Sequence, residues 1–171
     1  MPTKPGKYIG EYTARGIVSE ADTQAGNPQK IPLYDGRADT AYRVTGFKIW
    51  GSTGSSGMDT AGKLSKNDDG VTGQTNFFRA DDHNQIAWAG SDGFGDIFQT
   101  EVSIVDPDNL VIEDLYIYVR CNNSAGGSEP INYLVMMEKY QIDEWKGALT
   151  IARDCPQGDI VPICLKTKKR L

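Results

Sequence analysis

Strand-length runs of β-branched and aromatic residues, separated by clusters of glycine, proline, asparagine and aspartate, recur along this 171-residue sequence. The run from Tyr8 to Val18 alternates between small or apolar residues and polar ones, which is typical of a strand with one buried face. The run from Ala41 to Trp50 is rich in residues that pack well on a pleated sheet. Further strands are expected at residues 30–36, 84–90, 97–105, 110–121, 131–142 and 160–166.

The connections between the last three long runs predict how those strands pair. The sequence DPDN joins residues 97–105 to residues 110–121, and it suits a tight turn because Pro107 fixes its own φ and Asn109 tolerates a left-handed conformation. A longer glycine-rich loop, NNSAGGSEP, leads on to residues 131–142. We therefore expect three consecutive antiparallel strands at the centre of one sheet.

Two stretches depart from the strand pattern. Residues 51–82 are mostly Gly, Ser, Thr, Asn and Asp, and we expect a long loop there, which inside a compact domain is usually a functional loop or an inter-subunit arm. Residues 143–154 predict one short helix, because Asp143 suits an N-cap position and apolar residues follow on one helical face. The sequence CPQGD ends this helix.

Many short strands, glycine- and proline-rich turns and one late helix predict an all-β fold. The expected architecture is an antiparallel β-sandwich of jelly-roll type, with a β-barrel as the alternative. The chain is expected to form a single domain over residues 1–171. It carries a short N-terminal arm (1–7), the long loop (51–82) and a basic C-terminal tail (166–171). No internal repeat of roughly 20 to 50 residues indicates a propeller or a solenoid.

Composition is that of an ordinary globular protein, and it limits the expected partners. The hydrophobic fraction is 39% and the formal net charge is −5, which argues against disorder and against nucleic acid as the main partner. The N-terminus lacks the apolar run of a signal peptide, and no segment reaches the roughly 20 apolar residues of a membrane span, so we expect synthesis in a cytoplasm and no membrane partner. Cys121, Cys155 and Cys164 are odd in number and lack CxxC spacing, which indicates neither a zinc site nor a disulfide framework. Three reduced, mostly buried thiols are favoured over a Cys155–Cys164 disulfide, because free cysteine commonly behaves as a small core residue.

The sequence offers few candidates for catalysis or metal binding, and we expect neither an enzyme nor a cofactor. Asp81, Asp82 and His83 carry donor atoms that metals bind, but consecutive residues converge on a metal only in a loop, and a solvated loop is the simpler interpretation. A single histidine without an activated serine or cysteine argues against triad catalysis. Turn formation is the favoured interpretation of three acidic pairs, Asp68/Asp69, Asp106/Asp108 and Glu113/Asp114. The alternatives for these pairs are calcium binding and catalysis by paired carboxylates.

Aromatic and basic residues are the remaining candidates for a site. The aromatic residues gather in the loop-rich middle of the chain and suit a carbohydrate platform, whereas core packing or subunit contact is favoured. The basic tail either contacts an acidic partner or nucleic acid, or is a solvated terminus, which is the more common fate. The candidate interaction surface comprises Lys4, Lys7, Trp50, Phe77, Phe78, Trp88, Phe94, Lys166, Lys168, Lys169 and Arg170.

Four strand and turn phrases of the sequence are IPLYDGRADTAYRVTGFKIW, NQIAWAGS, NLVIEDLYIYVRCNN and INYLVMMEKYQI. They resemble segments of small β-rich structural proteins of marine tailed phages, and the resemblance extends from about Gly10 to Asp154. It implies a virion component and best fits a capsid decoration (cement) protein, a class commonly of β-sandwich or jelly-roll fold, often trimeric, on the outer surface of the capsid. The implied partners are the major capsid protein or other virion proteins, within a homo-oligomer for which a trimer is favoured. The alternatives are a tail, adaptor or head-completion protein of the virion, and a carbohydrate-binding module.

Overall fold

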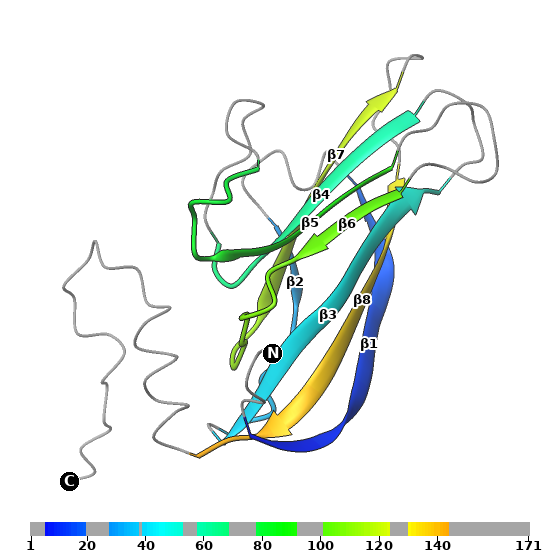
Figure 1. Ribbon diagram of the computed structural model, residues 1–171. Helices are drawn as coiled ribbons and strands as arrows, with labels where there is room; N and C mark the ends of the chain where they lie inside the picture. Colours follow the sequence, from blue (N-terminus) through cyan, green and yellow to red (C-terminus); the bar gives the residue numbers. More distant parts are fainter. Residues whose placement is uncertain are drawn as a thin grey trace, which may run out of the picture.

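Eight antiparallel β-strands make up the computed structural model in the part of the chain that it describes, residues 6–19, 28–37, 39–52, 58–68, 78–91, 101–123 and 130–143 (Figure 1). These ranges contain no helix, and so none that could cross a membrane. The strands are β1 (Lys7–Ser19), β2 (Gln29–Ile31), β3 (Thr40–Gly51), β4 (Met58–Ser65), β5 (Gln85–Ser91), β6 (Glu101–Val105), β7 (Leu115–Asn123) and β8 (Pro130–Gln141).

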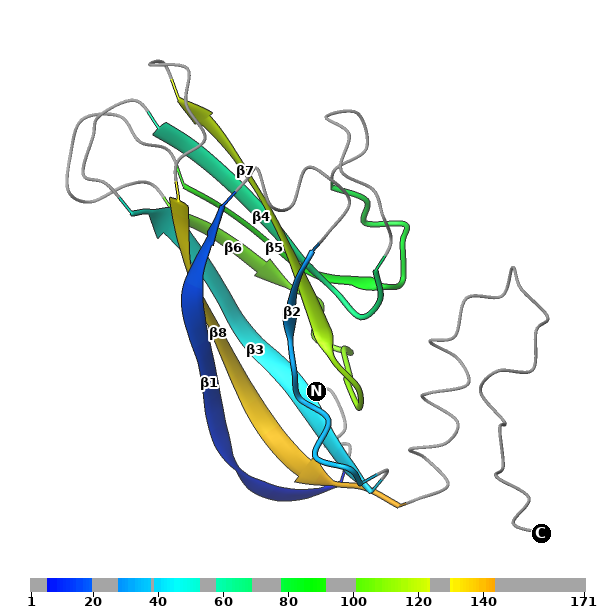
Figure 2. The same ribbon diagram turned by 180° about the vertical axis from the view of Figure 1, so that it is seen from behind.

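The strands form two sheets that pack face to face. One sheet has three strands in the order β1-β8-β3, and the other has five in the order β2-β7-β4-β5-β6. Figures 1 and 2 show the two sheets as separate layers. Buried apolar side chains from both layers form one continuous cluster between them. The prediction of an all-β fold built from antiparallel strands is confirmed, and the arrangement is sandwich-like.

The alternation of side chains along β3 and β8 builds one half of this core. In β8, Val135 and Met137 point inward and are buried. In β3 the inward positions change from even to odd, from Val44 to Phe47, because a β-bulge lies between Val44 and Gly46. The bulge therefore keeps Tyr42, Val44, Phe47 and Ile49 on the inner face of the sheet.

The predicted pairing of three consecutive strands is wrong. Strand β6 pairs with β5, β7 lies between β2 and β4, and β8 belongs to the other sheet. The DPDN turn does form, since Asn109 N–H donates to the Asp106 carbonyl at 3.3 Å. The chain that leaves this turn runs along the edge of β3 instead of returning along β6, and there Tyr42 and Val111 exchange both backbone hydrogen bonds at 2.7 and 2.8 Å.

The prediction of an unbroken loop at residues 51–82 is also wrong, because β4 lies within it, between β7 and β5. A Cβ atom at Gly62 would lie 3.1 Å from Ile49 and 3.3 Å from Phe47, so the two sheets approach closely at this point. The small residues of β4 therefore reflect close packing in a sheet rather than a loop. The other residues of the expected loop between β4 and its neighbours, 53–57 and 69–77, lie outside the described ranges.

Several expected features fall on residues that the structure does not describe. They are residues 144–154 of the expected helix, the strand expected at 160–166, and both Cys155 and Cys164. Cys121 lies half-buried in β7 and packs against the core.

The side chain of Asn109 completes the edge of β3 next to Val111. Its Oδ1 accepts Val44 N–H at 2.7 Å, and its Nδ2 donates to the Val44 carbonyl at 2.9 Å. Asn109 is 4% exposed, so water has little access to these groups. Because an amide side chain carries both a donor and an acceptor, Asn109 takes the place of one residue of a neighbouring strand.

Replacement of Asn109 by alanine is expected to lower the free energy of unfolding by about 2–3 kcal/mol, because the buried N–H and C=O of Val44 lose their partners. The matched control is Asn132→Ala, since Asn132 is half-buried and donates one long hydrogen bond, to Gly51 at 3.3 Å. The control is expected to lose less than about 1 kcal/mol. Urea unfolding followed by tryptophan fluorescence measures both variants, and equal losses would contradict the role given to Asn109.

Candidate interaction surfaces

The structure places the predicted surface residues on different sides of the protein. Trp50 lies near the end of β3 on the outer face of the three-stranded sheet and is 41% exposed. Trp88 lies on the outer face of the five-stranded sheet, and the exposed Phe78 precedes β5. Lys7 is exposed at the start of β1. The remaining candidates, Lys4, Phe77, Phe94, Lys166, Lys168, Lys169 and Arg170, lie outside the described residues.

Neighbouring rows of side chains form an apolar surface on the outer face of the three-stranded sheet. One row crosses β1, β8 and β3 at Ile17, Asn132 and Trp50, and Ile17 is 63% exposed. In the row beside it, the half-buried Leu134 of β8 lies between Arg15 of β1 and Lys48 of β3. We name this surface the outer sheet face, and it comprises Arg15, Ile17, Lys48, Trp50, Asn132, Leu134 and Met136.

Met136 extends the apolar centre of the outer sheet face. It lies between Thr13 and Gly46 in the third row. A Cβ atom at Gly46 would collide with the Met136 methyl group, so Gly46 makes room for Met136 to lie across β3. Leu134 and Met136 form an apolar centre on β8, and the flanking strands carry both apolar residues (Ile17, Trp50) and cations (Arg15, Lys48). A mixture of apolar residues and flanking charges is typical of protein interfaces.

The aromatic residues on the outer face of the five-stranded sheet make contacts within the protein. Lys63 of β4 is fully buried between Trp88 on β5 and Tyr118 on β7, and its Nζ lies 4.8 Å from the centroid of the Tyr118 ring. The Tyr118 hydroxyl donates to Asp68 at 2.7 Å, and Trp88 Nε1–H donates to Gln85 at 3.0 Å. Trp88 is half-buried, so it offers only part of its ring to a ligand.

The acidic residues that precede β5 stabilise a loop. The Asp82 carboxylate accepts Asn84 N–H at 3.0 Å, and the Asp81 carboxylate pairs with Arg79 at 2.7 Å. Within the described ranges, no group of three or more His, Cys, Asp or Glu side chains is arranged to hold a metal ion. Hydrogen bonding within the loop therefore accounts for both carboxylates next to His83.

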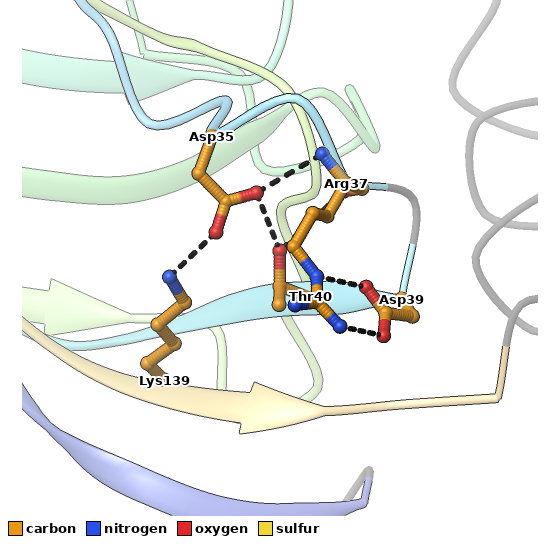
Figure 3. Close-up of polar contacts among 5 residues, drawn as sticks. All are labelled: Asp35, Arg37, Asp39, Thr40 and Lys139. Carbon is orange, nitrogen blue, oxygen red and sulfur yellow. Dashed lines mark hydrogen bonds and ion pairs between the residues drawn. The ribbon is translucent and has the colours of Figure 1, made fainter.

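A polar cluster lies where the chain passes from β2 to β3 (Figure 3). Asp35 Oδ1 accepts hydrogen bonds from Arg37 N–H at 3.1 Å and from the Thr40 hydroxyl at 2.9 Å. Asp35 Oδ2 accepts a third from Lys139 Nζ at 2.7 Å. The Arg37 guanidinium forms two bonds with Asp39, at 2.8 and 2.5 Å. We name these five residues the Asp35 cluster, which ties the connection that leaves β2 of one sheet to β8 of the other.

Lys139 is stabilised as a cation within the Asp35 cluster. Its Nζ lies 5.5 Å from the centroid of the Tyr12 ring and 5.1 Å from that of Tyr42. The hydrogen bond with Asp35 is the main cause that raises the pKa of Lys139 to about 12. The same bond is the main cause that lowers the pKa of Asp35 below its ordinary value. Both groups are therefore charged at neutral pH, which suits a structural ion pair and not proton transfer.

Comparison of the chain with protein-family models, with curated proteins and with solved structures finds no match. The functional inference therefore rests on the surfaces described above and on the strand order.

The variant Asp35→Asn is expected to lower the free energy of unfolding at neutral pH by about 1–3 kcal/mol, because Lys139 loses its counter-ion while its side chain remains only 12% exposed. The control Asp81→Asn removes a carboxylate whose side chain is 71% exposed, and it is expected to change little. Chemical unfolding of the three proteins measures the difference. Equal losses in the two variants would show that the Asp35 cluster contributes no more than a surface ion pair.

The Asp35–Lys139 pair also predicts how stability depends on pH. The lowered pKa of Asp35 gives a contribution that is present above the unfolded-state pKa, about 4, and is lost as the pH falls through the lower folded-state pKa. The raised pKa of Lys139 gives a contribution that is present below about 10.5 and is lost as the pH rises through about 12. The difference in unfolding free energy between the native protein and Asp35→Asn is therefore expected to shrink below about pH 4. A difference that stays constant down to about pH 2 would contradict this linkage.

Proposed function

We propose that this protein is a structural component of a tailed-phage virion, a capsid decoration protein whose outer sheet face docks on the shell. The observation that carries the proposal is the outer sheet face itself, in which Leu134 and Met136 lie on the central strand and exposed Ile17 and Trp50 lie beside the cations Arg15 and Lys48 on the flanking strands. A surface of this composition suits burial against a partner with an apolar centre and an acidic margin. Its partner in the virion is the major capsid protein or another protein of the shell.

The strand order supports a jelly-roll assignment within this proposal. A jelly roll has eight strands, and its folding pattern sets the first beside the eighth, the second beside the seventh, the third beside the sixth and the fourth beside the fifth. Here β1 pairs with β8, β2 with β7 and β4 with β5. Strand β6 departs from this pattern, because it pairs with β5 in the five-stranded sheet, and it reaches β3 through the Ser103 hydroxyl, which donates to the Phe47 carbonyl at 2.7 Å. Jelly rolls occur in viral capsid proteins and also in lectins and cupins. A jelly-roll fold is therefore compatible with a virion role but does not by itself identify the function.

The remaining support comes from the resemblance of the strand phrases to small phage structural proteins. A decoration protein is repeated over a symmetric shell, so many weak contacts act together and a modest docking surface is sufficient. The protein is then made in the host cytoplasm and reaches its final location on the capsid surface. A tail, adaptor or head-completion protein has the same requirements for docking and is the alternative within the virion.

A carbohydrate-binding module is the second candidate, and exposure of Trp50 favours it. An open indole ring on a sheet face can stack on a sugar, and lectins share the jelly-roll architecture. This candidate predicts that a glycan quenches tryptophan fluorescence in the native protein and not in Trp50→Ser.

Immunogold microscopy of purified particles from the source culture tests the proposed location. Even labelling over the head is the result expected of a decoration protein. Labelling of one vertex or of the tail would replace decoration with the adaptor or tail alternative. No labelling of any particle would overturn the virion proposal.

Substitution of Trp50 by serine tests the proposed docking surface. We expect Trp50→Ser to weaken binding of the purified protein to particles at least about tenfold, because it removes the largest exposed apolar side chain of the outer sheet face. The control is Tyr34→Ser, since Tyr34 is another exposed aromatic residue, 53% exposed, in the β2–β3 connection. Co-sedimentation with particles measures binding, and equal binding by the two variants would contradict docking through this surface.

A further inference from the structure

The two edges of the three-stranded sheet differ. The edge at β3 is covered: Val111 bonds Tyr42, Asn109 bonds Val44, and Ser103 bonds Phe47. The edge at β1 pairs with no strand in the described part of the chain, and Figures 1 and 2 show β1 at the outer margin of the sheet. Edge strands present a row of backbone donors and acceptors that can pair with another chain.

Strand β1 is long and exposes apolar side chains along its length. It has 13 residues, most of them exposed. Tyr8, Ile9, Tyr12 and Ile17 are 45%, 49%, 44% and 63% exposed. The pairing of its first residues is interrupted by a β-bulge between Tyr8 and Gly10, but the stretch from Gly10 to Ser19 pairs regularly with β8. A regular, exposed edge of this length is available for pairing with a partner strand.

When two copies of β1, KYIGEYTARGIVS, are aligned antiparallel about Thr13, charged residues of one copy face opposite charges on the other. Antiparallel pairing of two copies centred on Thr13 sets Glu11 of each copy opposite Arg15 of the other. Within the regular stretch from Gly10 to Ser19, the same register sets Tyr12 opposite Ala14 and Gly10 opposite Gly16 on each side of the centre. Opposite charges and apolar pairs on facing positions stabilise an antiparallel ladder.

Other registers lose this complementarity. Antiparallel pairing centred on Glu11 sets two glutamates opposite each other, and pairing centred on Arg15 sets two arginines opposite each other. Parallel pairing in register brings both like-charge pairs together. Like charges on directly facing positions destabilise a ladder, so the charges select the register centred on Thr13.

We propose that β1 pairs with β1 of a second copy of this chain, antiparallel and centred on Thr13, so that two three-stranded sheets join into one continuous sheet. Glu11, Thr13 and Arg15 lie on the same side of β1, because they face Glu138, Met136 and Leu134 of β8. The two Glu11–Arg15 pairs therefore form on one face of the joined sheet. The interface is the same patch on both subunits and closes as a dimer. It does not depend on the virion proposal.

Charge exchange tests this register. Glu11→Arg and Arg15→Glu are each expected to raise the dimer dissociation constant by about tenfold or more, because each places like charges on facing positions. The double variant Glu11→Arg/Arg15→Glu restores opposite charges and is expected to return the constant to within about threefold of the native value. Sedimentation of the full-length protein over a range of concentrations measures the constant, and thermal unfolding shows that each variant is folded.

An introduced thiol at the twofold centre provides an independent test. Facing Cα atoms in an antiparallel ladder lie about 4.5–5.5 Å apart, which a disulfide can span. Thr13→Cys is expected to give a position 13 to position 13 disulfide under mild oxidation, identified by peptide mapping. The control Thr45→Cys lies at an exposed position of β3 and is expected to give none.

Three results would overturn the inference. They are a native protein that is monomeric up to about 100 µM, single charge variants that dimerise as the native protein does, and a disulfide that forms equally at positions 13 and 45. These measurements use no particles. A monomer that still labels phage heads therefore rejects only the dimer, and a dimer that labels no particle rejects only the virion proposal.

Discussion

The three-stranded sheet depends on how its two edges are completed, because a buried backbone N–H or C=O without a partner costs as much as a lost hydrogen bond. At β3, the backbone of Val111 and the side chain of Asn109 take the place of a fourth strand. The same contacts draw the chain after the DPDN turn away from β6, and β7 then enters the middle of the other sheet. No described residue covers β1 in this way. Within the described residues, the sheet is therefore completed at one edge and ends in an unpaired strand at the other.

Periodicity in the sequence predicted where the strands lie, but not which strands are neighbours. Strands β1, β3, β5 and β8 lie within one residue of the expected runs at each end. Strand β4 was missed because Gly62 and Lys63 reflect tertiary contacts: Gly62 meets the opposite sheet, and Lys63 is buried between aromatic rings. The hairpin expected after the DPDN turn does not form, because turn residues define only local geometry and do not determine which strand the chain pairs with next. The direction of the chain is set by the contact of Asn109 with Val44, which is distant in sequence.

The candidate site was predicted less well than the strands, and the sandwich explains why. A sandwich has two outer faces, so aromatic residues from the middle of the sequence lie on opposite faces when they belong to different sheets, as Trp50 and Trp88 do. A signal for the outer sheet face was present. Ile17 falls on the otherwise polar side of β1, and Leu134 and Met136 make β8 apolar on both sides, a pattern typical of a strand with two buried faces. Contacts across the fold, such as that of Asp35 with Lys139, have no comparable signal in the sequence.

The self-complementarity of β1 is visible in the sequence, but it indicates pairing between two copies only because β1 is an edge strand of its sheet. In a central strand the same residues would face two different neighbours. In the proposed dimer the twofold axis is perpendicular to the joined sheet, because facing residues of an antiparallel pair point to the same side. Both copies of the outer sheet face then lie side by side. A shell built of repeated subunits can bind both copies at once, so pairing through β1 would strengthen docking without any new contact to the shell. An interface of this kind closes at two copies, and the threefold symmetry implied by the resemblance therefore requires a second surface.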